Sequence, residues 1–316
     1  MTETKMRRTG IALTLLLLLL SSSSLTNTAK PSDIRPMIVI QSDGGVDPLE
    51  APLKRNGETY TFTGNINAEI SVQKSNIVID GAGYTLHGPY NGTYESAFII
   101  GEGPDQVPSD VKVPYSIGID LAFPNVVGLT VKNLNIENFS IGMYIWTENN
   151  IVTGNAITNS IVGVLLSGSN NRITGNLVSN NTQGVFFGWT ETGAIPEGIE
   201  ISHNSFASNV QHLSGCLCEE YNFTEGIHTW DDGKQGNFWS DYNGTDANGD
   251  GIGDTRYEID PLNVDRYPLM QNYIGLPKVA QPLPFEAFIA GLVVVIVAVG
   301  ILMTLRKRRK EISKSL

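Results

Sequence analysis

The segment Ile136–Ile145 reads IENFSIGMYI, and its pattern returns twice at intervals of 21 residues. The two later copies are Ile157–Leu166, ITNSIVGVLL, and Val178–Phe187, VSNNTQGVFF. Apolar and polar residues alternate within each copy, as they do in short β-strands, and Asn and Gly separate the strands. A unit that repeats at this interval indicates a solenoid.

The length of the unit decides between solenoid classes. Helical repeats have periods of about 34 residues or more, and leucine-rich repeats need a strict leucine pattern. The sequence therefore predicts an all-β chain that forms a parallel β-helix with coils of ~21 residues. Because one coil cannot bury its own inner face, stacked coils must supply the core. The expected inward columns are Ile119, Met143, Val164 and Val185, and Leu121, Ile145, Leu166 and Phe187.

An asparagine recurs at one position of the repeat, at Asn138, Asn159 and Asn180. We expect these residues to form an inward ladder in which side-chain amides bond from coil to coil. A column of asparagines that binds a ligand is the alternative.

The repeat also sets the predicted domain plan. The N-terminal strands or cap cover 30–75, the coils cover 76–215 with an inserted loop at 89–116, and an acidic, aromatic closing segment covers 216–273. Long loops that interrupt a repeat are often functional.

Both ends of the chain carry targeting features. Residues 1–29 show the charged, apolar and small-residue order of a signal peptide. A proline-rich linker at 274–286 leads to the uncharged stretch 287–305, which is long enough for a transmembrane helix, and the tail 306–316 is basic. Basic clusters stay cytoplasmic, so we expect a single-pass membrane protein whose bulk is extracytoplasmic and whose C-terminus is cytoplasmic.

The charge of the exported body excludes one class of partner. Residues 30–284 hold 12 Lys and Arg against 29 Asp and Glu, a net charge of 12 − 29 = −17. Such a surface repels nucleic acid, so no nucleic-acid partner is expected.

The closing segment contains a candidate calcium loop. Oxygen-bearing groups fall at positions 1, 3, 5, 7 and 9 of an EF-like loop, although Tyr257 stands where the twelfth position needs Glu. The alternative is a turn that docks the neighbouring aromatic residues on the last coil. The predicted Ca²⁺ ligands are Asp246, Asn248, Asp250, the Ile252 carbonyl and Asp254.

Three stretches carry a family resemblance. They are NIVIDGAGYTLHG (76–88), the ITGN type of step at Val152–Asn155 and Ile173–Asn176, and the closing stretch Gly236–Met270. Over about residues 37–271 the chain resembles NosD-like β-helix proteins of the pectin-lyase-like superfamily, also called carbohydrate-binding and sugar-hydrolysis domains, which are frequent as surface proteins of archaea. The resemblance implies a right-handed, single-stranded parallel β-helix, and fold alone does not give function.

The family's name suggests a role in copper-site maturation. Copper is bound by His, Met or Cys, and the exported body offers one cluster of these, His212 with Cys216 and Cys218. The two cysteines can ligate a soft metal, close a small disulfide or stay as thiols. On this composition we do not expect copper.

Catalytic signals are weak. Asp231 and Asp232 are the adjacent acidic pair, and the polygalacturonase motifs are absent. The candidate bases of a lyase, Lys132 and Arg172, show no evident acidic partner one coil away. No catalytic residue is assigned, and the sequence leaves enzyme activity open while favouring a non-catalytic protein.

Outward aromatic residues favour carbohydrate recognition. Aromatic faces stack on sugar rings, although the closing segment or the inserted loop would cover this face in the alternative arrangement. We expect recognition of surface or extracellular carbohydrate, or a structural role at the surface; a polysaccharide hydrolase or lyase is the first alternative and a copper accessory protein the second. The candidate residues are Tyr144, Trp146, Phe186 and Trp189.

Five Asn-X-Ser/Thr sequons occur. Asn138 and Asn180 belong to the expected inward ladder, so we do not expect glycans on them. The expected acceptors are Asn91, Asn222 and Asn243.

Overall fold

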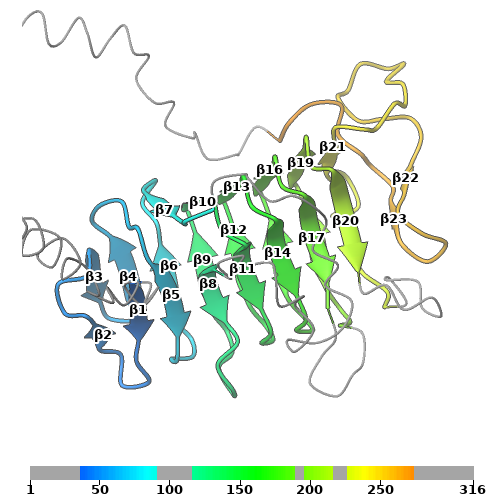
Figure 1. Ribbon diagram of the computed structural model, residues 1–316. Coiled ribbons are helices and arrows are strands. Elements are labelled where there is room, and N and C mark those ends of the chain that lie inside the picture. Colours follow the sequence, from blue (N-terminus) through cyan, green and yellow to red (C-terminus); the bar gives the residue numbers. More distant parts are fainter. Residues whose placement is uncertain (1–35, 91–115, 189–195, 216–225, 274–316) are drawn as a thin grey trace, which may run out of the picture. The chain divides into compact units, whose positions relative to one another are not determined.

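The computed structural model describes residues 36–90, 116–188, 196–215 and 226–273 (Figure 1). These residues are all-β and contain no helix. No helix in the described ranges is long and apolar enough to cross a membrane. The predicted signal peptide at 1–29 and the predicted membrane helix at 287–305 lie outside those ranges.

Three sheets carry the coils. In spatial order, the first contains β2 (Val46–Asp47), β1 (Met37–Ile40), β5 (Glu69–Val72), β8 (Ile117–Leu121), β11 (Ile141–Ile145), β14 (Val162–Leu166), β17 (Gln183–Phe187) and β20 (Gln211–Gly215). The second contains β18 (Glu200–Ser202), β15 (Arg172–Thr174), β12 (Ile151–Thr153), β9 (Thr130–Lys132), β6 (Val78–Asp80), β4 (Thr59–Phe62) and β3 (Leu53–Asn56). The third contains β21 (Phe238–Trp239), β19 (Ser205–Ala207), β16 (Leu177–Ser179), β13 (Ala156–Thr158), β10 (Asn135–Glu137) and β7 (Thr85–His87).

Strand pairing follows the repeat. The coil strands pair in parallel, and Ile136 lies opposite Ile157, which in turn lies opposite Val178. Antiparallel pairs occur only at the ends of the described solenoid, between β1 and β2, between β3 and β4, and between β22 (Tyr257–Glu258) and β23 (Val264–Asp265). This arrangement fits the predicted parallel β-helix; the handedness of the coil stays a prediction.

The core is the stack of inward columns. Both predicted columns are buried, from Ile119 to Val185 and from Leu121 to Phe187. Each side chain therefore packs on its equivalents in the coils before and after it, which is how a solenoid forms a core from units that have none.

The prediction that Asn138, Asn159 and Asn180 form an inward ladder is wrong. Asn138, Asn159 and Asn180 adopt left-handed backbone with φ of 62°, 54° and 57°. Asn159 and Asn180 are exposed and Asn138 is half-buried. These residues turn the chain at the corner of each coil, and Asn tolerates that conformation better than most residues do.

The buried ladder lies at a different corner of the coil. Its members are Asn155, Asn176, Asn204 and Asn237, all fully buried. Asn155 donates its backbone N–H and its Nδ2 to Asn176 Oδ1, both at 3.0 Å, and Asn176 donates to Asn204 Oδ1 in the same way. Asn204 repeats the pattern to Asn237 at 3.0 and 3.1 Å. Buried amides are thereby satisfied along the solenoid.

The closing segment covers the end of the core. Strand β21 pairs with β19, and Trp239 stacks on Phe206 with ring centroids 4.6 Å apart. Trp230 and Trp239 are each 1% exposed. Isolated bridges join Leu269 to Phe238 and to Ile252, so the segment also pairs with itself.

Candidate functional site

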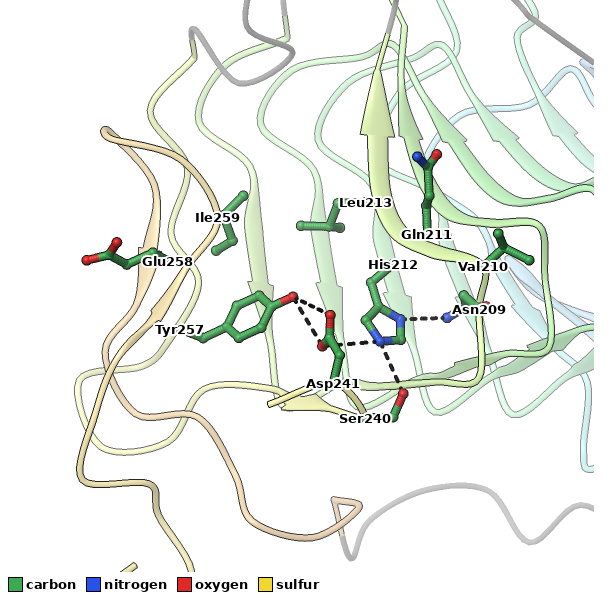
Figure 2. A pocket seen from close by; sticks show the side chains of 10 residues that line it. All are labelled: Asn209, Val210, Gln211, His212, Leu213, Ser240, Asp241, Tyr257, Glu258 and Ile259. Atoms are coloured by element: carbon green, nitrogen blue, oxygen red, sulfur yellow. Dashed lines mark hydrogen bonds and ion pairs between the residues drawn. The ribbon is translucent and has the colours of Figure 1, made fainter. Parts of the chain in front are cut away.

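A pocket of about 380 Å³ opens between the last strand of the first sheet and the closing segment (Figure 2). Its walls are the turn before β20, the strand β20, the residues that follow β21, and the strand β22. A pocket of this size suits a small molecule.

A column of glycines explains why a pocket forms here. Gly142, Gly163 and Gly184 occupy equivalent places in β11, β14 and β17, and a Cβ on any of them would lie 2.5 to 2.7 Å from the carbonyl oxygen of the next coil. His212 stands at the next place, in β20. Among the described strands β20 is the edge of its sheet, so no further strand packs against His212 and its side chain has room. The site therefore begins where the glycine column ends.

Hydrogen bonds fix the tautomer of His212. Asn209 Nδ2 lies 3.2 Å from His212 Nδ1. The amide of Asn209 cannot turn over without cost, because its Oδ1 accepts from the backbone N–H and the Nδ2 of Asn181, at 3.0 and 3.1 Å. Nδ1 of His212 is therefore an acceptor, and the ring proton of the neutral form sits on Nε2.

The Nε2–H of His212 points at the pocket (Figure 2). Ser240 Oγ lies 3.2 Å from Nε2, and Asp241 Oδ1 lies 3.4 Å from it. Burial lowers the pKa of His212, against the opposing effect of Asp241. A neutral ring that donates from Nε2 cannot take a proton from Ser240, so this group is not a nucleophile with its base.

Tyr257 forms another wall of the pocket. Its ring stacks on Trp239 with centroids 4.5 Å apart and planes 6° apart. Its hydroxyl donates to Asp241, whose two carboxylate oxygens lie 3.2 and 3.1 Å away. Burial, and then the negative charge of Asp241, raise the pKa of Tyr257. The hydroxyl thus stays protonated and holds the carboxylate in place.

Asp265 anchors the closing segment through hydrogen bonds. This carboxylate is fully buried and accepts from Asn237 N at 2.7 Å, Trp239 Nε1 at 2.9 Å and Tyr267 N at 3.1 Å. Burial raises the pKa of Asp265 to about 6, although these donors oppose the shift. The asparagine ladder therefore ends on an acid that also fixes Trp239, on which Tyr257 stacks.

The candidate calcium loop is closed by its own backbone. Asp246 accepts the N–H groups of Gly249 and Gly251 at 2.7 and 2.9 Å, and Asp254 accepts that of Ala247 at 2.8 Å. Asn248 Nδ2 donates to Asp250 at 2.9 Å. Across the described ranges no three His, Cys, Asp or Glu side chains gather closely enough to hold a metal ion. Calcium at this loop stays a prediction.

The outward aromatic column is packed rather than open at Phe186, which is 3% exposed. It belongs to a second cluster with Ile141, Ile161, Val162 and Leu165, against which Tyr90 and Tyr144 pack. Tyr144 is half-buried and meets Trp146 edge to face at 5.7 Å. Trp189 lies outside the described residues. Sugar stacking on this column stays a prediction.

The candidate acidic pair, Asp231 and Asp232, holds nearby backbone and the Arg266 side chain by hydrogen bonds. Burial alone would raise the pKa of Asp231, but hydrogen bonds from the Arg266 side chain outweigh it and lower the pKa. The backbone N–H of Gln235, above all, lowers the pKa of Asp232. Neither carboxyl group has the raised pKa of a general acid in a glycosidase.

One sequence inference about the cations is wrong. Lys132 Nζ lies 3.3 Å from Asp80 in the previous coil, and Arg172 Nε lies 3.2 Å from Glu200 in the next. The strand register places each partner directly alongside. The partners are distant in sequence because insertions separate the coils, so their alignment was not evident.

The candidate soft-metal cluster of His212, Cys216 and Cys218 is not tested, because only His212 lies within the described residues. The expected glycosylation sites Asn91 and Asn222 also lie outside them. Asn243 is exposed. A metal-bound His normally donates its other ring N–H, but Nδ1 of His212 faces a donor. His212 Nε2 is therefore a poor metal ligand as the site stands.

His228 is the histidine that sequence reasoning missed. It is 7% exposed and stacks on Phe187 at 5.3 Å, and within the described residues neither ring nitrogen has a hydrogen-bond partner. Burial lowers its pKa to about 4. A neutral imidazole with two unpartnered nitrogens costs free energy where it is, because buried polar groups are usually satisfied.

The fold and the pocket define a parallel β-helix with a polar site at the end of its first sheet. Residues 116–244 match a family model described as periplasmic copper-binding protein (NosD). The probable ABC transporter binding protein NosD of Stutzerimonas stutzeri is 34% identical over 87 residues, and the match covers 26% of this chain and 18% of that protein. No solved structure matches the chain.

These comparisons confirm the resemblance to NosD-like β-helix proteins that the sequence predicts. The periplasmic description agrees with an extracytoplasmic body. The same description names copper, which conflicts with the sequence expectation that copper is not bound. The chain spans less than a fifth of the matched relative, so that protein's activity is not transferred as a finding.

Proposed function

We propose that this protein is an extracytoplasmic binding protein of the NosD-like β-helix type, and that its pocket beside β20 holds a polar ligand of the carbohydrate class. The observation that carries the proposal is the set of fixed polar groups around a cavity of about 380 Å³. Ligand sites combine such rigid polar groups with apolar walls.

The chemistry of the walls suits hydroxyl groups. The Asp241 side chain is 60% exposed, and its carboxylate, already held by Tyr257, has room to accept from a ligand's hydroxyls. Gln211 and Glu258 add an exposed amide and an exposed carboxylate. Leu213 and Ile259 supply half-buried apolar contact. A sugar presents this mixture of hydroxyls and apolar ring faces.

The test is binding, measured with the full-length protein on a glycan array and then by calorimetry on the best glycan. Asp241→Asn should weaken binding by about tenfold or more, because a charged acceptor is lost. Glu50→Gln, an exposed carboxylate at the other end of the described body, is the matched control and should bind as the parent does. No glycan bound, or equal loss in both variants, would reject the proposal.

The setting of this function is proposed from the ends of the chain. A signal peptide at 1–29 would export the body, and the stretch 287–305 would hold it at the membrane. Protease treatment of intact cells should cut the body and spare the tail at 306–316.

A second candidate function is copper handling, which the family match favours. A described residue that fits a soft metal is His228, since its ring is neutral and both nitrogens lack a hydrogen-bond partner among the described residues. When bound, copper would supply redox or transfer chemistry, and His228 would contribute one imidazole ligand. The cysteines at 216 and 218 would be further ligands on sequence grounds alone.

Direct Cu(I) titration against a competing chelator tests this second candidate. His228→Ala should weaken Cu(I) affinity, and His203→Ala, a control whose ring is paired with Asp232 at 3.3 Å, should not. Equal affinity in the parent and both variants would remove His228 from any copper site.

A further inference from the structure

Three turns of the solenoid differ in one chemical property. Asn138, Asn159 and Asn180 occupy equivalent left-handed positions after β10, β13 and β16. Asn138 and Asn180 begin Asn-X-Ser/Thr sequons. Asn159 is followed two places later by Ile161, so it is not an N-glycosylation acceptor. The fold therefore presents two sequons and one natural control on the same edge.

The turn at Asn180 is open. Asn180 is exposed, and within the described residues its side chain makes no hydrogen bond, while its backbone N–H is held by Ala207 O at 3.1 Å. Thr182, the hydroxyl residue of the sequon, is also exposed. The backbone of the turn is fixed and the amide is free to react.

The turn at Asn138 is closed. Asn138 is half-buried, and its Nδ2 lies 3.3 Å from His87 Nδ1. The hydroxyl residue of this sequon, Ser140, is 6% exposed, and its Oγ accepts the N–H of Ser116 at 3.2 Å. The sequon is thus hydrogen-bonded and partly buried at Asn138, and exposed two coils later at Asn180.

We infer that Asn180 carries an N-linked glycan and that Asn138 does not. In the transfer, Asn180 Nδ2 bonds to the anomeric carbon of a lipid-pyrophosphate-linked oligosaccharide. The bond from that carbon to the pyrophosphate oxygen breaks, the lipid pyrophosphate leaves with the bonding electron pair, and the amide nitrogen releases one proton to solvent. No electron transfer is needed. The inference depends on an extracytoplasmic body and not on the ligand of the pocket.

The position of the glycan matters for the pocket. Val210, in the equivalent turn of the next coil, donates its backbone N–H to Asn181 O at 3.0 Å. Its side chain lines the pocket and is 80% exposed (Figure 2). A glycan on Asn180 would therefore stand one coil away from a residue that lines the pocket.

Glycopeptide mass spectrometry of the protein from its natural host tests the inference. Trypsin has no site between Arg172 and Lys234, so chymotrypsin is the better enzyme. We expect a glycan mass on peptides with Asn180, and unmodified peptides for Asn138 and Asn159. Peptides that contain only unmodified Asn180 overturn the inference, as does a glycan on Asn138.

Variants made in the same host separate modification from folding. Thr182→Ala keeps the turn asparagine and destroys the sequon, so the glycan should disappear while the unfolding temperature changes little. Thr182→Ser keeps the sequon, and the glycan should remain. A glycan that persists in Thr182→Ala would place it elsewhere and overturn the assignment.

Discussion

Among the columns of asparagines that run through these coils, one lies buried and another lies at the outer turns. Asn155 and Asn176 lie inside and satisfy one another's amides. Asn159 and Asn180 lie outside and serve through their backbone conformation. The residue type is the same, but one column holds the coils together and the other only bends each coil. The comparison teaches that an asparagine repeat does not reveal which property of asparagine is used.

The largest effect should come from breaking the buried column. Asn176→Ala removes an acceptor for Asn155 and a donor to Val152 O and Asn204. Since each unsatisfied buried group costs about 1–3 kcal/mol, the free energy of unfolding should fall by roughly 3–5 kcal/mol. Urea unfolding measures this loss.

The matched change in the outer column is Asn159→Ala. It forces alanine into left-handed backbone, at a cost of about 1–2 kcal/mol. Equal losses in the two variants would show that the two columns do not differ as described.

His228 extends the comparison to a buried polar side chain that, among the described residues, has no hydrogen-bond partner. Its folded pKa of about 4 lies below its ordinary value of 6.5. As the pH falls below 6.5, the His228 imidazole binds a proton in the unfolded chain but stays neutral in the folded chain. The free energy of unfolding that is present above pH 6.5 is therefore lost progressively toward pH 4. His228→Phe should remove this loss, making the variant about 3 kcal/mol less acid-sensitive between pH 7 and 4.

Unfolding at several pH values measures that difference. Burial of Asp265 acts in the opposite direction, because its raised pKa stabilises the fold as the pH falls through about 6. This contribution is present in both proteins and cancels in the comparison. Parallel pH profiles would mean that His228 is not buried neutral.

The glycine column offers a smaller contrast between the middle of the sheet and its end. A Cβ at Gly163 would lie 2.6 Å from Gly184 O, so Gly163→Ala should cost about 1–3 kcal/mol. His212→Ala, at the end of the same column, leaves no such clash and should cost less. Thermal unfolding of the two variants checks the order, and a reversed order would contradict the explanation of the pocket.

The smallest expected effect is that of calcium on the closing segment. If the predicted loop binds Ca²⁺ with a dissociation constant near 1 mM, then about 10 mM Ca²⁺ should raise the free energy of unfolding by ~1.4 kcal/mol. Asp250→Ala should abolish the rise. An unchanged unfolding temperature in the parent would leave the loop as a turn that docks the closing segment.

The repeat was sufficient to predict the strands and the core. Ile136, Ile157 and Val178 recur at 21 residues, and in the structure they pair directly. The pocket could not be predicted in this way, because its walls come from β20, the residues that follow β21, and β22, which no interval in the sequence relates. One signal was present: the column of glycines ends in His212.

The sequence by itself determined the repeat, the alternation and hence the parallel β-helix, because these depend on local periodicity that every coil shares. Only the tertiary structure decided which asparagines face inward. Counting alternate residues from Ile157 puts Asn159 inside, but its left-handed φ of 54° turns the corner and sends it outward. The tertiary structure also brought Tyr257 to Asp241 and, among the described residues, left the ring nitrogens of His228 without hydrogen-bond partners. Contacts between such distant segments depend on how the closing segment folds back on the last coil.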